Sequence, residues 1–384
     1  MDSFIDTTPF FNSQQRTLAT RLAEFTEREV EPRAGADERD AEEALRSYIQ
    51  LLHDHDFLRY AVAAPKERFN LRAFCIVRET LSYSSALADL AFVMQGLGTY
   101  AISLAATEHV RDFWLDRARS GQSIAAFALT EPDAGSDVSG LKTEARREGD
   151  AYIINGRKRF ISNAGVADFY TVFARTGTRA DGRAEISAFI VSARMPGFSV
   201  AERTEMIALH PIGELEFKEC RVPAEDMIGN QGDGLRLALQ TLDMFRASVG
   251  AAACGMARRA LDESVHYAKT RVQFGKPLAQ HQLIQEKLAD MITELDAARL
   301  LVYRAAYLKD AGDERSTREA SEAKLFATEA AGRIIDQAVQ IHGGSGLVRG
   351  SVVERLYRDV RALRIYEGTS EIQKLVIANQ LLKE

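Results

Sequence analysis

One carboxylate near the end of the chain could act as a catalytic base. Glu367 lies in the run Ile365-Tyr-Glu-Gly-Thr-Ser-Glu-Ile, directly before Gly368, at a predicted break between two helices. A glutamate there, flanked by Tyr366 and apolar neighbours, can be desolvated, which raises the pKa of its carboxyl group. Removing a proton from carbon needs such a base. A glutamate before a glycine is more often an ordinary solvated residue, so the assignment depends on the rest of the chain.

Two segments earlier in the chain could bind a flat polar ring. The run Ala128-Leu-Thr-Glu-Pro-Asp-Ala-Gly-Ser-Asp provides the hydroxyl groups of Thr130 and Ser136, in a turn whose backbone amides could bind a ring or an anion. Phe160 and Ser162, two apart on a predicted strand, should project from one face. That arrangement suits holding a heterocycle and hydrogen bonding to its edge. A surface turn and a core phenylalanine are the alternative interpretations.

Two further segments could hold a ligand. Arg271 opens the run Arg-Val-Gln-Phe-Gly-Lys-Pro-Leu at the end of a predicted helix, and its planar guanidinium could bind a phosphate through two hydrogen bonds. A charge at a helix C-terminus beside a turn is the alternative. In Gln340-Ile-His-Gly-Gly-Ser-Gly, the pair Gly343 and Gly344 would let a ligand approach the backbone closely.

Composition limits the classes of function. The chain has 384 residues, 46% of them hydrophobic and 27% charged, as in soluble globular proteins, and it is too long for one ordinary core. A net charge of −6 argues against binding through nucleic-acid phosphates. Cys75, Cys220 and Cys254 have no metal-ligand spacing, so we expect no metal site. Neither a targeting segment nor a membrane span is recognisable, and we expect a cytoplasmic protein.

The elements that must position these residues change type twice along the chain. Apolar residues follow helical spacing in 1–122, alternate with period two between turn residues in 123–232, and return to helical spacing in 233–384. In the middle segment, Asn155-Gly156 is predicted to form the tight turn of a β-hairpin. In the last, apolar residues from Ile284 to Ala305 predict a helix of about 25 residues in an antiparallel bundle.

In their order along the chain and at these separations, these segments, with Gln340–Ile372 counted as one of four, resemble the acyl-CoA dehydrogenase family. The resemblance runs over nearly the whole chain and is densest in Ala125–Asp137 and Gln340–Gln373. It implies a multidomain α+β fold that is mainly α, with an N-terminal helical domain, a middle antiparallel β-barrel or sandwich and a C-terminal four-helix bundle. By similarity, FAD binds where the three domains meet.

The resemblance also implies which residues contact FAD. Thr130 matches the family's threonine at the flavin ring, Phe160 its aromatic packed against the flavin, and Ser162 its hydroxyl at the N5 edge. Thr369 matches a residue near the diphosphate. The side facing the diphosphate and adenosine of a neighbouring subunit's FAD is matched by Arg271, Phe274, Gln340 and Gly344. A cofactor shared in this way implies at least a homodimer, and the family is usually tetrameric.

On the substrate side, the resemblance implies a path for CoA that ends at the base. Contacts to the pantetheine arm and the CoA side are matched by Ser136, Asp243 and Arg246. Glu367 matches the catalytic base, and Tyr366 beside it is assigned to the substrate side. Some members carry the base at the position of Phe245, which cannot accept a proton, so Glu367 is favoured.

The implied reaction is the α,β-dehydrogenation of an acyl-CoA thioester to a trans-2-enoyl-CoA. Glu367 removes the α-proton, the β-hydrogen leaves as hydride to flavin N5, and an electron-transfer flavoprotein is the expected acceptor. An acyl-CoA oxidase-like enzyme would share every motif but pass electrons to oxygen. A nucleic-acid-binding relative of the same fold depends on a basic surface, which the net charge of −6 disfavours.

Three stretches depart from the family's pattern and leave the acyl group open. Met206–Glu214, which contains His210-Pro-Ile-Gly, is unlike the usual segment at that place. Leu347 stands where an aromatic is common, and Pro65–Asn70 lacks the paired glycines often found there.

The floor of the acyl pocket should depend on the apolar run Leu81–Ala106. Val93 and Gln95 are its predicted lining. Gly96 and Gly98 interrupt this run, which indicates close packing, a ligand pocket or a plain break between helices.

Overall fold

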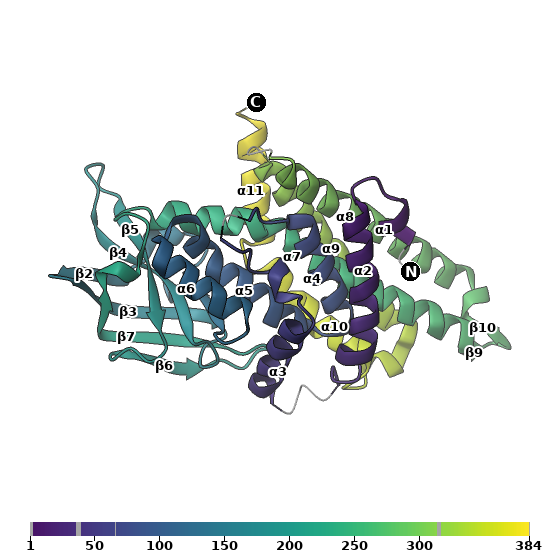
Figure 1. Ribbon diagram of the computed structural model, residues 1–384. Helices are drawn as coiled ribbons and strands as arrows, with labels where there is room; N and C mark the ends of the chain where they lie inside the picture. Colours follow the sequence, from purple (N-terminus) through teal and green to yellow (C-terminus); the bar gives the residue numbers. More distant parts are fainter. Residues whose placement is uncertain (1–2, 36–39, 66, 313–315, 384) are drawn as a thin grey trace.

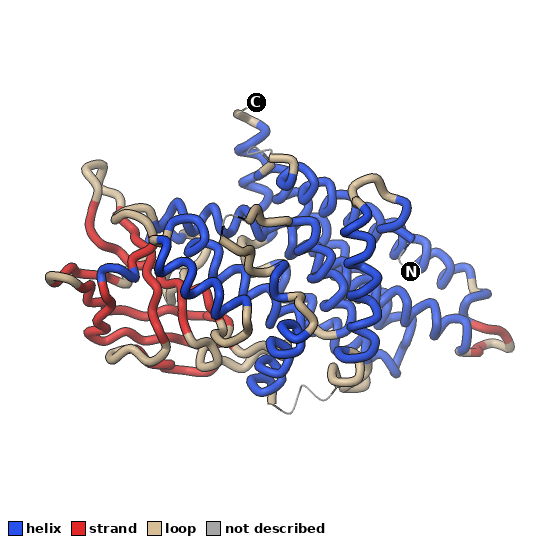
Figure 2. The backbone as a smooth tube through the Cα atoms, viewed as in Figure 1, coloured by secondary structure: helices blue, strands red, loops and turns tan. Residues whose placement is uncertain are grey.

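The computed structural model describes residues 3–35, 40–65, 67–312 and 316–383. An eight-stranded sheet forms one end of the molecule, and helices from both halves of the chain form the rest (Figures 1 and 2). The predicted α+β fold, mainly α, with helical segments on either side of a β segment, is confirmed. The boundaries after residues 122 and 232 stay a prediction.

The first part of the chain folds into helices whose central pair is buried. Its helices are α1 (Ser3–Thr7), α2 (Ser13–Phe25), the π-helix η1 (Thr26–Val30), α3 (Ala41–Asp54), the 3₁₀ turn η3 (Leu58–Tyr60), α4 (Leu71–Ser84), α5 (Ala86–Ala105) and α6 (Glu108–Arg119). By length and composition α5 could cross a membrane, but 83% of its most apolar window is buried inside the protein. It is therefore a core helix here.

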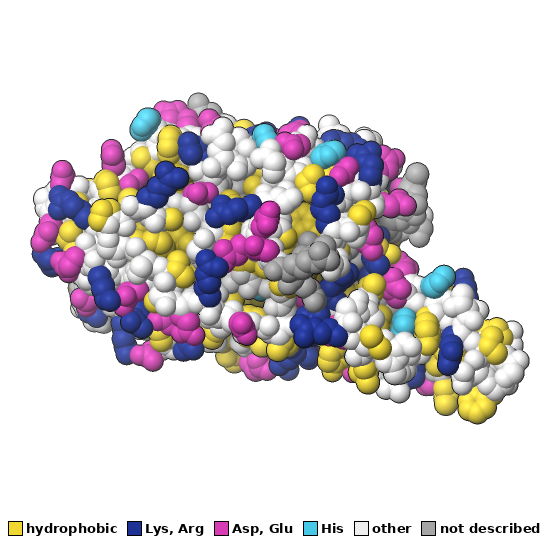
Figure 3. Space-filling view, turned by 90° about the horizontal axis from the view of Figure 1, so that it is seen from below, with side chains coloured by type: hydrophobic (Ala, Val, Ile, Leu, Met, Phe, Trp, Pro, Cys, Tyr) yellow, Lys and Arg dark blue, Asp and Glu magenta, His cyan; other side chains and the backbone are white. Residues whose placement is uncertain are grey.

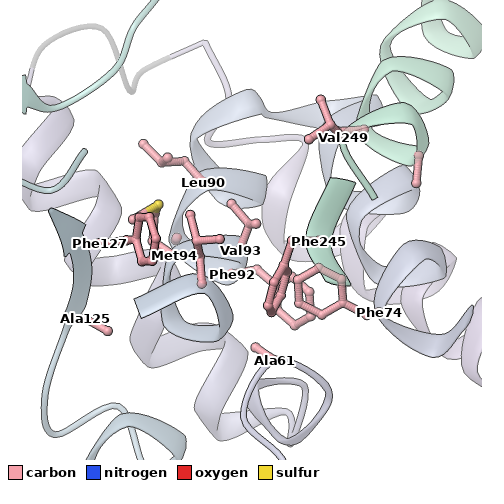
Figure 4. Close-up of a cluster of buried hydrophobic side chains, with 14 of the residues drawn as sticks. Ala61, Phe74, Leu90, Phe92, Val93, Met94, Ala125, Phe127, Phe245 and Val249 are labelled. Atoms are coloured by element: carbon pink, nitrogen blue, oxygen red, sulfur yellow. The ribbon is translucent and has the colours of Figure 1, made fainter. Parts of the chain in front are cut away.

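Helix α5 runs without interruption through both of its glycines, because its neighbours approach too closely for a side chain. A Cβ atom on Gly98 would lie 2.7 Å from the Cβ of Ala125, and one on Gly96 would lie 3.0 Å from the ring of Phe245. Figure 4 shows Phe245 beside Phe74 and Phe92 in this region. Close packing is thus the correct interpretation of these glycines, and a break between helices is wrong.

The middle part of the chain forms the sheet, in the order β6-β7-β3-β2-β4-β5-β8. Its strands are β1 (Ala125–Ala128), β2 (Glu144–Glu148), β3 (Ala151–Ser162), β4 (Phe169–Thr178), β5 (Ala184–Ser192), β6 (Phe198–Arg203), β7 (Ile212–Pro223) and β8 (Met227–Ile228). Most pairs are antiparallel, as predicted, but β1 runs parallel to β4.

The predicted hairpin turn at Asn155-Gly156 is wrong. Both residues lie inside β3, at a register shift in its pairing with β7. Asn155 there exchanges hydrogen bonds with Glu219 of β7, of 2.6 and 2.8 Å. Gly156 lets β3 pass close to Thr143, since a Cβ atom would lie 2.6 Å from its Oγ1. The β2–β3 turn is instead at Gly149, which has a φ of 60°.

The last part of the chain is a helix bundle. Its elements are α7 (Gly234–Thr270), the hairpin β9 (Val272–Gln273) and β10 (Lys276–Pro277), α8 (Gln282–Asp310), α9 (Thr317–His342), the 3₁₀ turn η7 (Gly343–Leu347), α10 (Val352–Val360), the 3₁₀ turn η8 (Arg361–Arg364) and α11 (Ser370–Leu381). The predicted helix over Ile284–Ala305 is part of α8. Helices α7, α8 and α9 pack on one another, and α4 and α11 pack against them. The bundle therefore packs a helix of the N-terminal part against the C-terminal helices.

Candidate active site

Glu367 lies in the short connection between η8 and α11, in a strained conformation. Its φ is 53°, and that of Gly368 is 88°. A left-handed conformation is unusual for a residue with a side chain and must be held by its surroundings. Gln373 holds it: its Nε2 donates to the carbonyl oxygens of Glu367 and Gly368, at 3.2 and 2.9 Å. Thr369 then caps α11 by accepting from the Ile372 amide at 3.3 Å.

One oxygen of the Glu367 carboxylate is buried and unpaired among the described residues. The residue as a whole is half-buried, yet its Oε2 is buried and has no hydrogen-bond partner among the described residues. Burial raises the pKa of Glu367, and the nearby charges of Arg78, Lys324 and Arg246 oppose that shift only in part. Lys324 donates its Nζ proton to the carbonyl of Gly368, at 2.7 Å, and not to the carboxylate. The carboxylate is thus free to accept a proton.

A buried charged pair lies behind Tyr366. Arg78 of α4, 1% exposed, donates to both oxygens of Asp89 in α5, at 2.8 and 2.7 Å, and to Ser248 Oγ in α7, at 3.0 Å. Burial raises the pKa of the Tyr366 hydroxyl, and the positive charge of Arg78 partly offsets the rise. Arg78 therefore links α4, α5 and α7, and its charge acts on the residue that precedes Glu367.

Helix α7 supplies the predicted CoA-side pair. Arg246 donates to Ser321 Oγ at 3.1 Å and to Asp243 Oδ1 at 3.3 Å, and Asp243 also accepts from Lys309 at 2.8 Å. Burial lowers the pKa of Arg246. The structure thus brings Arg246 into the electrostatic field of Glu367, while Asp243 is occupied by two cations.

Phe245, which lies between Asp243 and Arg246 in the sequence, packs into the interior against aromatic residues of the N-terminal part. Its ring centroid lies 5.0 Å from that of Phe74 and 5.4 Å from that of Phe69. That Gln95 lines the acyl pocket stays a prediction. Its amide is used by the backbone: it donates to Ala118 and Ser123 carbonyls and accepts from Ala125 N–H at 2.7 Å. Val93 is 5% exposed in the same packed region (Figure 4).

On the β side, a buried ion pair holds the loop that carries Thr130. Lys158 of β3 is fully buried and donates to Glu131 at 2.8 Å and to the Leu129 carbonyl at 3.0 Å. Glu131 also accepts from the amides of Lys142 and Thr143. These bonds lower the pKa of Glu131, and burial lowers the pKa of Lys158 to about 8. The backbone carbonyl of Thr130 accepts a hydrogen bond from the Arg159 amide at 2.9 Å.

Phe160 and Ser162 end β3 with Ile161 buried between them. Phe160 is 50% exposed, has a φ of 53°, and carries the Arg159 guanidinium 4.9 Å from its ring centroid. A register shift between Lys158 and Ile161 breaks the regular pairing here. The Oγ of Ser162 lies 2.7 Å from Nε2 of His210.

The remaining predicted residues are exposed. Ser136 lies in the loop after β1. Arg271 and Phe274 belong to the β9–β10 hairpin, which protrudes at the end of the molecule opposite the sheet (Figures 1 and 3). Phe274 is 95% exposed. Gln340 lies in the last turn of α9, and Gly344 follows in η7. Helix α9 is tied to the base of the hairpin because His342 stacks on Tyr267 with ring centroids 4.4 Å apart.

A large cleft separates the β part from the bundle. Its volume is about 930 Å³, and it lies between residues 206–209 and the elements α9, α10 and η8. Its cations are Arg333, Arg349, Arg358, Arg361 and Arg364. None of the predicted site residues lines it. It borders both halves of the site, however, since Leu209 precedes His210 and Arg364 lies three residues before Glu367.

Models of three protein domains match the chain in sequence. They are the N-terminal, middle and C-terminal domains of acyl-CoA dehydrogenases, over residues 12–122, 126–220 and 232–382. The chain belongs to the acyl-CoA dehydrogenase family. Its members include flavoprotein oxidoreductases of acyl-CoA metabolism, and this protein is an enzyme of that class.

Individual relatives in the family agree. The 3-(aryl)acrylate reductase of Clostridium sporogenes is 40% identical over 97% of this chain and 100% of its own. The human mitochondrial short-chain specific acyl-CoA dehydrogenase is 46% identical over 70% of this chain and 66% of its own. The butyryl-CoA dehydrogenase of Megasphaera elsdenii has the same fold, with a TM-score of 0.89 and 35% identity over 97% of this chain and 99% of its own.

Several residues around Glu367 and Ser162 were not predicted from this sequence. Asp89 was missed although it is the single charge in the otherwise apolar helix α5, which is a usable signal. Arg78 was missed in a helix that also contains Arg72 and Glu79. Lys324 carried no such signal, because its helix is rich in charged residues. His210 was noted only as part of an unusual segment, and its contact with Ser162 needed the fold.

Proposed function

We propose that this enzyme uses FAD to oxidise an acyl-CoA thioester to a trans-2-enoyl-CoA, with Glu367 as the base. The observation that carries the proposal is the state of that carboxylate. One of its oxygens is buried without a hydrogen-bond partner among the described residues, its pKa is raised, and Lys324 donates to a backbone carbonyl instead. A base poised in this way suits the removal of a weakly acidic proton on carbon.

The residues on the β side fit a bound flavin. Phe160 offers an exposed aromatic face, and Thr130 and Ser162 offer hydroxyl groups on the same end of β3 and its neighbouring loop. The arginine-lined cleft has the size of a cofactor site and the charge that a diphosphate needs. When bound, FAD would supply acceptance of the substrate's β-hydrogen as hydride.

The backbone around Glu367 could polarise the thioester. No backbone carbonyl of the described residues accepts from the Glu367 N–H. A donor fixed next to the base can stabilise the negative charge that develops on the thioester oxygen as the α-proton leaves. Arg246, buried in α7 and close to Glu367, would hold the CoA side together with Asp243 and Ser136.

The second half of the cofactor site requires another copy of the chain. Phe274 is almost fully exposed on a protruding hairpin, together with Arg271, and Gln340 and Gly344 lie exposed near its base. An exposed aromatic ring of this kind indicates a contact surface. We infer a homodimer or homotetramer in which these residues contact the FAD of a partner. An electron-transfer flavoprotein is the proposed electron acceptor, and a cytoplasmic location stays a prediction.

Anaerobic titration with a panel of acyl-CoAs tests the proposal. Purified protein should carry flavin absorbance, and at least one acyl-CoA should bleach it. Absence of bound flavin, or no bleaching by any chain length, would contradict the proposal. Hydrogen peroxide formed in air would reassign the acceptor to oxygen, as in an acyl-CoA oxidase.

A second candidate is the same reaction run in the reducing direction. The observation behind it is the similarity over the whole chain to a relative named as a 3-(aryl)acrylate reductase. The same residues would then act in reverse, with Glu367 returning the α-proton. Rapid reoxidation of the reduced enzyme by an enoyl-CoA, combined with no bleaching by the saturated acyl-CoA, would favour it.

A further inference from the structure

His210 is held against Ser162 by the pairing of two strands. It lies in the loop between β6 and β7, and its Nε2 is 2.7 Å from the Ser162 hydroxyl oxygen. The loop is fixed on both sides of the ring: Thr204 N donates to the Ile212 carbonyl at 2.9 Å, and Asn163 N donates to the Pro211 carbonyl at 2.8 Å. The contact is therefore built into the sheet.

The imidazole of His210 is neutral at ordinary pH. Burial lowers its pKa to about 4, and no neighbouring charge contributes to the shift. A neutral imidazole has one nitrogen that donates and one that accepts, and the tautomer decides which is which. Nε2 can therefore either donate to the Ser162 oxygen or accept the Ser162 proton.

The choice of tautomer determines what Ser162 can offer to a third group. A hydroxyl has one proton and two acceptor sites. If His210 donates to Ser162, the serine proton is free to point elsewhere. If His210 accepts that proton, Ser162 presents only its oxygen. The pair can thus act as a donor or as an acceptor at the same place.

We propose that His210 is a positioning residue that lets Ser162 meet the edge of the bound flavin in both of its redox states. This rests on the proposed function, in which Ser162 faces N5. In the oxidised ring N5 accepts a hydrogen bond, and after two-electron reduction it carries a hydrogen and donates. In the reduced state the serine proton needs another acceptor, which is His210.

Removal of the His210 side chain should therefore destabilise the complex with reduced flavin more than the complex with oxidised flavin. Without the imidazole, Ser162 accepting from N5–H would leave its own proton without this acceptor in a half-buried place. An unpaired donor is more costly than an unused acceptor site on oxygen. The reduced flavin should bind more weakly relative to the oxidised flavin, and the midpoint potential should fall.

The test is a double-mutant cycle on the FAD-loaded enzyme, with the midpoint potential of the bound flavin as readout. In His210→Phe, the ratio of reduced to oxidised flavin affinity should fall about tenfold, which is a drop of about 30 mV for a two-electron couple. In a Ser162→Ala background the same substitution should have no effect. His210→Gln, which keeps a donor and an acceptor, should restore most of the potential. Exposed His109 on α6, changed to Phe, is the matched control.

Equal shifts in both backgrounds, or no shift in either, would overturn the inference while leaving the dehydrogenase assignment intact. A wild-type protein without flavin would instead contradict the proposed function. If His210→Phe does not fold, nitrogen NMR of labelled histidines in the wild-type holoenzyme still decides. The donor and acceptor nitrogens of His210 should exchange when the flavin is reduced, and an unchanged tautomer would refute the proposal.

Discussion

Glu131 and Glu367 both place a carboxylate in the interior near a lysine, yet their pKa values shift in opposite directions. Glu131 accepts from Lys158 and from two backbone amides, and its pKa is lowered. Glu367 has a buried oxygen with no hydrogen-bond partner in the described part of the chain, and its pKa is raised. The difference lies in the charge of Lys158 and in the hydrogen bonds to the carboxylate of Glu131, which together outweigh burial and stabilise its ionised state.

The two lysines differ in the same way. Lys158 donates a hydrogen bond to the carboxylate of Glu131, whereas Lys324 donates to the backbone carbonyl of Gly368. Burial lowers the pKa of both to about 8. A buried carboxylate beside a buried lysine is therefore a structural pair at one end of the site and a poised base at the other. Substitution of Glu131 should therefore reduce stability, and substitution of Glu367 should reduce the rate of catalysis.

Glu367→Gln should cause the largest kinetic loss. General-base catalysis typically contributes about 10²–10⁴-fold, so substrate should reduce the flavin slower by that factor. Glutamine keeps the size of the side chain, so FAD content and acyl-CoA binding should be retained. Stopped-flow reduction and equilibrium binding measure the two effects separately. Full-rate bleaching in this variant would remove Glu367 from the role of base.

Glu131→Gln should lower the stability of the protein instead of the rate of flavin reduction. Removing one partner of a buried ion pair leaves the other charge uncompensated, and the free energy of unfolding should fall by about 3–5 kcal/mol. Because the folded pKa of Glu131 is lowered, its contribution to stability is present above the unfolded pKa of about 4.3 and is lost as the pH falls through the folded pKa. The difference from wild type should therefore shrink in acid.

Denaturant unfolding at several pH values measures this prediction. The matched control is Asp133→Asn in the same loop, because Asp133 forms an exposed pair with Lys142. It should leave the unfolding midpoint unchanged. A Glu131→Gln variant as stable as the control would show that the buried pair does not hold the loop.

The sequence alone predicted the order of helical and β segments, because apolar periodicity is a local property. It also located Glu367 and Ser162 as candidates. What it did not predict are pairings between distant segments. Arg78 and Asp89 are eleven residues apart and meet only because α4 and α5 turn back on each other, and His210 reaches Ser162 only through the β3–β7 pairing.

The wrong turn at Asn155-Gly156 has the same origin. The dipeptide favours a tight turn by itself, but here the glycine serves a close approach to Thr143 and the asparagine bonds across a register shift to Glu219. Tertiary packing decided between two local conformations that the residues permit. Lys324 likewise gave no local signal, since its direction depends on where Gly368 lies.

Lys324→Met should change the pH dependence and leave the chemistry in place. The ammonium lowers the pKa of Glu367, so its loss should raise that pKa further. The base is active when ionised, so the acid limb of the flavin-reduction profile should move to higher pH. Gly368 keeps a donor, Gln373 Nε2 at 2.9 Å, which limits damage to the backbone. Exposed Lys374, changed to Met, should leave the profile unchanged, and a shift to lower pH in Lys324→Met would contradict the assignment.

Thr369→Ala should have the smallest effect and tests how the base is held. Thr369 caps α11, and loss of an N-cap typically costs about 1 kcal/mol of stability. Thr369→Ser keeps the capping oxygen and is the matched control. If Thr369 also contacts FAD, the alanine variant should release the cofactor faster than the serine variant at equal stability of the apoprotein. Equal rates of FAD release from the two variants would show that Thr369 only caps α11. The strained turn at Glu367 would then be held by Gln373 and the cap, without a contribution from the flavin.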